Sequence, residues 1–177
     1  KLAAHQDAIY LNDKLFQRIQ TVYEKRDSLK LDPESLRLVE VVYRNFVHAG
    51  AKLSAADKAR LKDLNKEEST LSTAFANKLL AATKAGALVI DDKAKLDGLS
   101  DAEMAAAEQA AKDRGMTGKY VLTLQNTTQQ PLLQDLKDRA TRQALFEASW
   151  NRAEKGDDND TRKTIERLAQ VRAEQAK

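Results

Sequence analysis

Hydrophobic positions recur at intervals of three and four residues over most of the chain, which is the spacing of amphipathic helices. Near the start the pattern is interrupted at Asn12, so it predicts a short helix before Asn12 and another from residue 13 to about residue 28. Asp32 and Pro33 form a start signal, because aspartate caps helices and proline is tolerated at their first position. The helix that they open is predicted to end near Gly50.

The longest helix is predicted from about residue 55 to residue 84. Ser54 followed by Asp57 is typical of a capping box with the shorter acid, and Gly86 is a stop signal. One hydrophobic stripe runs along this segment and comprises Leu61, Leu64, Leu71, Phe75, Leu79 and Leu80.

Two short apolar runs depart from helical spacing and are typical of β-strands. They lie at about residues 87–91 and 119–124. We expect the two strands to pair, and we expect a helix that begins at Ser100 and ends near Arg114 to pack over them.

Helical spacing returns at Pro131, which is predicted to start a stretch that continues from residue 139 to residue 154. A polar loop follows at residues 155–160, and Asp160 or Thr161 is expected to cap the last helix. The pattern therefore predicts a mainly α fold, a multi-helix lobe with one small two-stranded β element. Without an internal repeat or a long linker, residues 1–177 are predicted to form a single helical lobe.

The amino-acid composition argues against several classes of fold, metal site and partner. Gly at 6 and Pro at 2 are scarce for an all-β fold, and the absence of cysteine excludes disulfides and thiolate metal sites. Thirty basic residues against 27 acidic ones are interspersed, which argues against a nucleic-acid partner because nucleic acids require a clustered basic face. No apolar run approaches the roughly 20 residues of a membrane span, so no membrane partner is expected.

The two histidines of the chain are not spaced as ligands of a metal centre. His5 and His48 fall on different predicted helices without a His or Cys partner at ligand spacing. The chain also lacks a His-Glu-x-x-His motif, so we predict no metal ligand and no catalytic or cofactor-binding residue. His48 is expected to lie at a helix end, where a cation interacts favourably with the helix dipole.

Four other candidates are better explained as structure. The acidic run 157–160 fails the calcium-loop pattern, and the run 115–119 lacks the glycine spacing of a phosphate loop. Glu67 and Glu68 are helix neighbours whose side chains diverge by about 100°, which is wrong for a shared acid–base pair. Phe146 and Trp150 are expected to lie in the core rather than to form a stacking platform.

The order of the segments resembles the N-terminal lobe of the thimet-oligopeptidase family of zinc metallopeptidases. Within this family, the runs 37–42 and 126–131 are most similar to the bacterial dipeptidyl carboxypeptidases. The similarity covers essentially the whole chain, and its other main segments are Asn12-Asp13-Lys14-Leu15-Phe16, Phe46-Val47-His48-Ala49-Gly50-Ala51, Arg142-x-x-Leu145-Phe146-x-Ala148 and Ile165-x-x-Leu168-x-x-x-Arg172-x-x-x-Ala176.

Two departures accompany this resemblance. Many relatives have asparagine directly before the last helix, where this chain has Thr161. The family's His-Glu-x-x-His helix and its downstream glutamate ligand are absent from this sequence. The resemblance therefore implies an activity that this segment is not expected to perform alone.

The resemblance implies a cytoplasmic enzyme that removes dipeptides from the carboxyl ends of short peptides. Two histidines and one glutamate outside this chain would hold one zinc ion, and the motif glutamate would activate the bound water. This chain would be an internal fragment, without the catalytic zinc domain, that forms a wall of the peptide channel. Its partners would be the remaining catalytic lobe and short peptide substrates.

The two ends of the sequence fit a fragment. The chain begins at Lys1 without methionine, and its last helical run reaches residue 177 without a stop signal; a native start is the alternative. We therefore expect exposed apolar faces where a missing lobe packs, and no peptidase activity from the isolated chain even with added zinc. The other reading is a stand-alone helical protein-interaction module without enzymatic activity.

Overall fold

The computed structural model describes residues 1–177 and is mainly helical, with eight α-helices and one two-stranded sheet. This confirms the predicted fold class. The chain divides into two compact units: unit 1 comprises residues 1–72 and 167–177, and unit 2 comprises residues 73–166. That residues 1–177 form one lobe of a larger peptidase stays a prediction.

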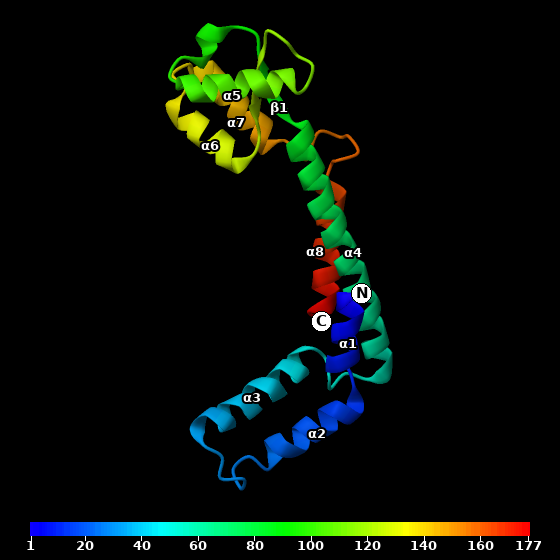
Figure 1. Ribbon diagram of the computed structural model, residues 1–177. Coiled ribbons are helices and arrows are strands. Elements are labelled where there is room, and N and C mark those ends of the chain that lie inside the picture. The colour runs from blue at the N-terminus through cyan, green and yellow to red at the C-terminus, as the bar shows by residue number, and fades with distance from the viewer. The chain divides into compact units, whose positions relative to one another are not determined.

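Unit 1 begins with three helices, α1 (Leu2–Tyr10), α2 (Asp13–Glu24) and α3 (Pro33–His48). Asn12 caps α2, which ends earlier than predicted, and Asp32 caps α3 through the backbone N–H groups of Glu34 and Ser35. Helices α2 and α3 lie side by side (Figure 1) and enclose a small core of Phe16, Phe46 and Ala51, against which Tyr10, Ile19, Val42, Tyr43 and Val47 pack.

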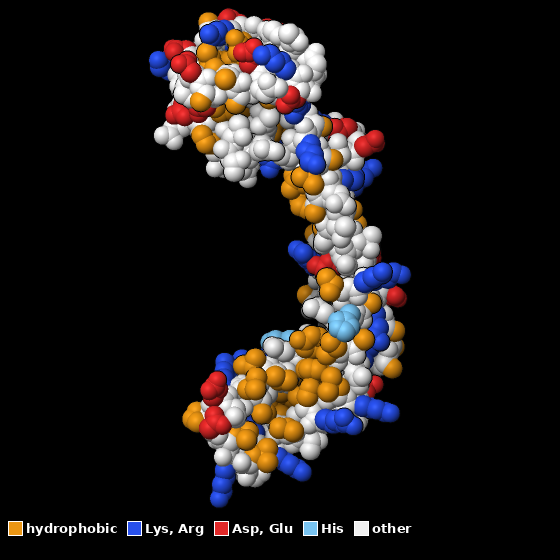
Figure 2. All heavy atoms as spheres, in the orientation of Figure 1, with side chains coloured by type: hydrophobic (Ala, Val, Ile, Leu, Met, Phe, Trp, Pro, Cys, Tyr) orange, Lys and Arg blue, Asp and Glu red, His pale blue; other side chains and the backbone are white.

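An apolar strip remains open on α2 and α3. It comprises Ile19, Val22, Leu38, Val39 and Val42 and forms a shallow groove of about 320 Å³. Leu38 is 62% exposed, and Figure 2 shows hydrophobic side chains gathered over these two helices. The expectation of exposed apolar faces is confirmed, while the lobe that would cover them stays a prediction.

Helices α4 (Ala55–Ala85) and α8 (Arg162–Gln175) each contribute residues to both units. Ser54 opens α4 as predicted, because its hydroxyl accepts the Asp57 backbone N–H at 3.1 Å and donates to the Asp57 carboxylate. No helix combines the length and the hydropathy that crossing a bilayer requires.

Unit 2 contains the predicted pair of strands, β1 (Ala87–Ile90) and β2 (Tyr120–Thr123). They run antiparallel, with Leu88 opposite Leu122. A 3₁₀ turn (Lys93–Leu96) and α5 (Asp101–Lys112) lie between the strands in sequence, and α5 packs on β2 as expected. Ser100 and Glu103 form a complete capping box at the start of α5.

The segment after the sheet differs from the prediction. Helix α6 (Asn126–Asp135) begins five residues before Pro131, which lies inside it, and α7 (Arg139–Trp150) is a separate helix that ends before residue 154. A proline removes only one helical hydrogen bond, and the burial of Gln129 and Leu132 on one face of α6 offsets the loss of that bond. The predictions that Pro131 starts this stretch and that it runs unbroken are therefore wrong.

Two side chains explain the break between α6 and α7. Arg142 donates to the carbonyl oxygens of Leu136 and Lys137 at 2.6 and 2.7 Å, and so satisfies backbone groups after the end of α6. Asp138 accepts the Thr141 backbone N–H at 2.7 Å and caps α7. Both helices close over the core of unit 2, which comprises the buried residues Ile90, Leu96, Ala107, Leu122, Leu124, Leu132, Leu136 and Leu145.

Candidate functional site

The two histidines lie apart from each other and from other ligands. His5 is exposed on α1, and His48 is exposed in the last turn of α3, where it was expected. The structure brings together no group of three or more His, Cys, Asp or Glu side chains that could hold a metal. The residues of this chain therefore do not fit the zinc ion that the family resemblance implies.

Glu67 and Glu68 each bind an arginine of α8. The Glu67 carboxylate accepts from Arg167 Nε and Nη2 at 2.6 and 2.9 Å, and Glu68 Oε1 accepts from Arg172 Nε at 2.8 Å. These hydrogen bonds hold the pKa of both carboxyl groups below their usual range, with Gln175 also contributing at Glu68. Because the two acids bind different arginines, they form no shared acid–base pair.

The glycine-rich run at residues 115–119 is a turn that leads from α5 to β2. The Met116 backbone N–H returns to the Ala111 carbonyl oxygen at 2.8 Å, which ends the helix, and Lys119 pairs with Asp91 at 2.9 Å. The interpretation as a helix stop followed by a turn is confirmed.

Phe146 and Trp150 are the candidates that the sequence misplaced. Trp150 is 74% exposed and Phe146 is 49% exposed, so the expectation that they lie in the core is wrong. Their rings stack with centroids 5.6 Å apart and planes inclined by 21°. The physical reason is that Leu145, the residue before Phe146, is fully buried and turns the Phe146 face of α7 outward.

A groove of about 470 Å³ opens beside these two rings. Helix α6 contributes Asn126, Gln129, Gln130 and Leu133, and α7 contributes Phe146, Ser149 and Trp150. The rest of the lining comes from one residue of α4, the loop after α7 and the start of α8, namely Leu79, Arg152, Ala153, Glu154, Thr161, Arg162 and Ile165. All these residues belong to unit 2, and the groove combines apolar surface with amide and guanidinium groups.

Two polar side chains in the groove stand out. Gln129 is only 5% exposed, and its amide forms no hydrogen bond with another residue of the chain. No buried side-chain N or O atom of the chain lacks a hydrogen-bond partner, so the unpaired Gln129 amide is accessible to solvent. Arg152 donates to Ser149 Oγ at 3.1 Å but, unlike Arg162, has no carboxylate partner.

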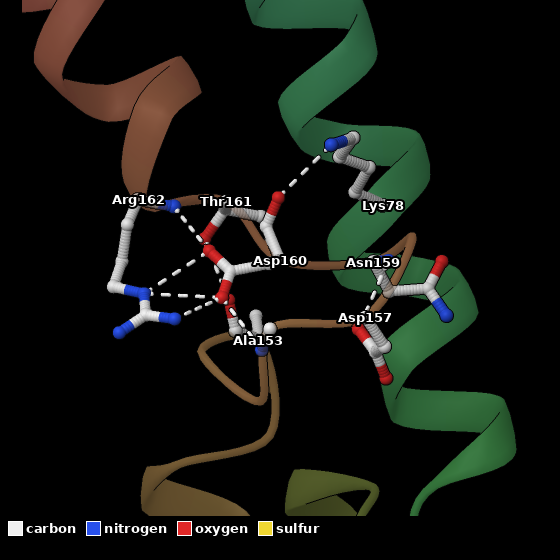
Figure 3. A network of polar contacts seen from close by, with 8 residues as sticks. Lys78, Ala153, Asp157, Asn159, Asp160, Thr161 and Arg162 are labelled. Carbon is white, nitrogen blue, oxygen red and sulfur yellow. Dashed lines mark hydrogen bonds and ion pairs between the residues drawn. The ribbon is translucent and has the colours of Figure 1, made fainter.

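Asp160 organises the loop between α7 and α8 (Figure 3). Its carboxylate accepts the backbone N–H groups of Gly156 and Arg162 at 2.8 and 3.0 Å and pairs with the Arg162 guanidinium, while its carbonyl oxygen accepts from Lys78 at 2.9 Å. The Thr161 hydroxyl instead donates to the Ala153 carbonyl oxygen at 3.2 Å. Of the two predicted caps, Asp160 is therefore the one whose side chain caps α8.

Asp160→Asn should lower the thermal stability of the chain at neutral pH, with a smaller loss in acid. The Arg162 side chain, first among several donors, holds the pKa of the Asp160 carboxyl far below its usual range. A depressed pKa adds stability above the ordinary aspartate pKa, and this stability is lost as the pH falls toward the folded value. Melting curves of both proteins at neutral pH and at about pH 3 measure the difference.

Asp158→Asn is the matched control, because Asp158 is exposed in the same loop and its side chain forms no hydrogen bond or ion pair. It should leave the melting temperature unchanged at either pH. A constant difference between the wild type and Asp160→Asn at all pH values would contradict the role assigned to this carboxylate.

The groove was not predicted from the sequence, although one signal for it was present. Phe146 and Trp150 are spaced by four residues and therefore lie on the same face of α7. The partners of that face come from α4, α6 and α8, and their convergence depends on long-range packing that local patterns do not reveal.

Comparison with known proteins shows that the whole chain is similar in sequence to parts of peptidases. The chain is 53% identical over 176 residues to dipeptidyl carboxypeptidase of Escherichia coli (strain K12), and 53% identical over 177 residues to dipeptidyl carboxypeptidase of Salmonella typhimurium. These alignments cover 99% and 100% of this chain but 26% of each relative, so the chain spans about a quarter of their length. A probable cytosolic oligopeptidase A of Arabidopsis thaliana is 28% identical over 169 residues, which are 92% of this chain and 24% of that protein.

No protein-family model matches the chain. The similarity nevertheless extends from the first residues to the last and includes both dipeptidyl carboxypeptidases and an oligopeptidase A. Because identity of this extent over a whole chain reflects common descent, the chain is homologous to part of the dipeptidyl carboxypeptidases, and its resemblance to the thimet-oligopeptidase family is confirmed.

Proposed function

We propose that this chain is a non-catalytic segment of a zinc peptidase that removes dipeptides from the carboxyl ends of short peptides. The observation that carries the proposal is 53% identity to a dipeptidyl carboxypeptidase over 176 residues. The whole protein would act in the cytoplasm, and its zinc ion would be bound by residues outside this chain.

The character of the segment supports a structural role in that enzyme. The carboxylates of Glu67 and Glu68 bind arginines, and the two histidines lie apart from other metal-ligating side chains, which supports a non-catalytic role. We propose that its helices form a wall of the peptide channel, where they limit access by size and exclude water. The catalytic lobe of the same chain would be its main partner.

One observation favours a second candidate function. The apolar strip on α2 and α3 is exposed, and such a strip is also typical of a stand-alone module that binds a partner protein. The two functions differ in a simple way, because only the first requires peptide hydrolysis by the protein that contains this chain.

Dipeptide release by the full-length protein tests the proposal. A short peptide with a free carboxyl end should lose dipeptides, as detected by mass spectrometry, whereas the same peptide with an amidated end should react far more slowly. A chelator should abolish the reaction, and zinc should restore it.

The 177-residue chain alone serves as the comparison and should hydrolyse neither peptide, even with added zinc. Turnover by this chain that a chelator removes would overturn its non-catalytic role. If the full-length protein releases no dipeptide, the peptidase proposal fails and the interaction module becomes the better reading.

A further inference from the structure

The groove of unit 2 has the chemistry of a binding site rather than of a gap in packing. Gln129 lines the groove, and its solvent-accessible amide forms no hydrogen bond within the chain, so that its donor and its acceptor are both free for a ligand. An amide offers both a donor and an acceptor, which is what a peptide group in an extended segment also requires.

The apolar part of the groove lies around the exposed aromatic pair. Trp150 and Phe146 form a stacked surface, and Leu79, Leu133 and Ile165 contribute aliphatic groups to the same lining. Exposed tryptophan is costly to keep in water and is enriched where proteins bind partners. This surface fits one large apolar side chain of a ligand.

Charge complementarity defines the third feature of the ligand. Arg152 is partly buried beside Ser149 and lacks a carboxylate partner, whereas Arg162 is neutralised by Asp160. The one acidic residue of the lining, Glu154, is exposed and forms no ion pair with Arg152. A guanidinium group with free donors binds a carboxylate through charge-assisted hydrogen bonds.

We propose that this groove binds an extended peptide segment that carries a large apolar side chain next to an acidic one. Gln129 pairs with a backbone peptide group, Trp150 and Phe146 contact the apolar side chain, and Arg152 binds the carboxylate. The choice of a peptide rests on the proposed function, and the site would hold a part of the substrate remote from the bond that is cleaved. Such a site selects peptides without taking part in the chemistry.

Binding is tested with the full-length protein by fluorescence anisotropy of a labelled peptide that contains Leu-Glu within alanines and serines. Two D-residues at its carboxyl end prevent turnover, so that the measurement does not depend on peptidase activity. Two further probes replace the pair by Leu-Gln or Ser-Glu. Each replacement should weaken binding roughly tenfold, the effect of losing one charged hydrogen bond or one buried apolar side chain.

Four variants assign the contacts. Arg152→Gln should weaken binding of the Leu-Glu peptide roughly tenfold and leave the Leu-Gln peptide unchanged, because only the first offers it a carboxylate. Trp150→Ala should reduce the preference for leucine over serine. Gln129→Leu keeps the volume and should weaken all three peptides, whereas Gln134→Leu, an exposed substitution on α6 outside this groove, should change none.

Circular dichroism verifies that each variant is folded. If Gln129→Leu does not fold, Arg152→Gln still tests the proposal. The proposal is overturned if wild-type protein binds the three peptides equally, or if Arg152→Gln weakens the Leu-Glu and Leu-Gln peptides alike. It is also overturned if the variants change stability but not binding, since the groove is then covered by another segment of the protein. Dipeptide release by the wild type, measured separately, shows whether the proposed function itself has failed.

Discussion

Gly98→Ala should destabilise unit 2 by about 3 kcal/mol, more than its single added methyl group suggests. Gly98 has a φ of +102°, which side chains of L-residues rarely adopt, and a Cβ there would lie 2.0 Å from the Asp135 carbonyl oxygen. The backbone cannot yield easily at this point, because the Lys137 N–H donates to the Asp97 carbonyl oxygen at 2.9 Å and the side chain of Leu136, the residue after Asp135, is buried. Urea unfolding followed by circular dichroism measures the loss.

Gly118→Ala separates the two causes. Gly118 also has a positive φ, of +83°, but no atom lies within contact of an added Cβ. This variant should lose only the conformational part, about 1 kcal/mol. Equal losses in the two variants would show that the close approach to Asp135 contributes nothing.

Elements with local start signals were predicted well. The side chains of Asp32, Ser54 and Ser100 each accept helix N–H groups from within three residues, so the sequence near each site suffices to locate the helix start. The pairing of the two strands was also predicted, because the chain has only two strand-like runs and each needs a partner.

Elements that depend on tertiary contacts were predicted less well. Pro131 was interpreted as a helix start because proline favours the first position, yet burial of Gln129 and Leu132 extends α6 on its amino-terminal side. Likewise, Arg142 reaches back to the end of α6, and its sequence position alone does not reveal this contact.

The candidate site shows the same limit more strongly. Phe146 and Trp150 were predicted to be buried because aromatic residues usually are, and helical periodicity alone does not say which of two apolar faces meets the core. On α7 the face that meets the core is the one that carries Leu145, whose side chain is buried where α7 packs against β1 and α6. Burial of one face thereby exposes the other, and the exposed face becomes the groove wall.

Leu145→Ala should therefore cost about 3 kcal/mol of unfolding free energy, as is typical of a leucine replaced in a packed core. Leu145 is fully buried in the cluster formed by the sheet, α5, α6 and α7, so the missing atoms would leave a cavity that the surrounding backbone cannot fill. Trp150 is the only tryptophan of the chain and lies on the same helix, so its fluorescence during urea unfolding reports unit 2.

Leu80→Ala is the matched control, because it removes the same atoms from a leucine of unit 2 that is 55% exposed. It should cost about 0.5 kcal/mol or less. Similar losses in the two leucine variants would mean that Leu145 is not the residue that sets the orientation of α7. A large loss confined to Leu145→Ala, together with weaker peptide binding at Trp150, would connect the packing of the core directly to the geometry of the groove.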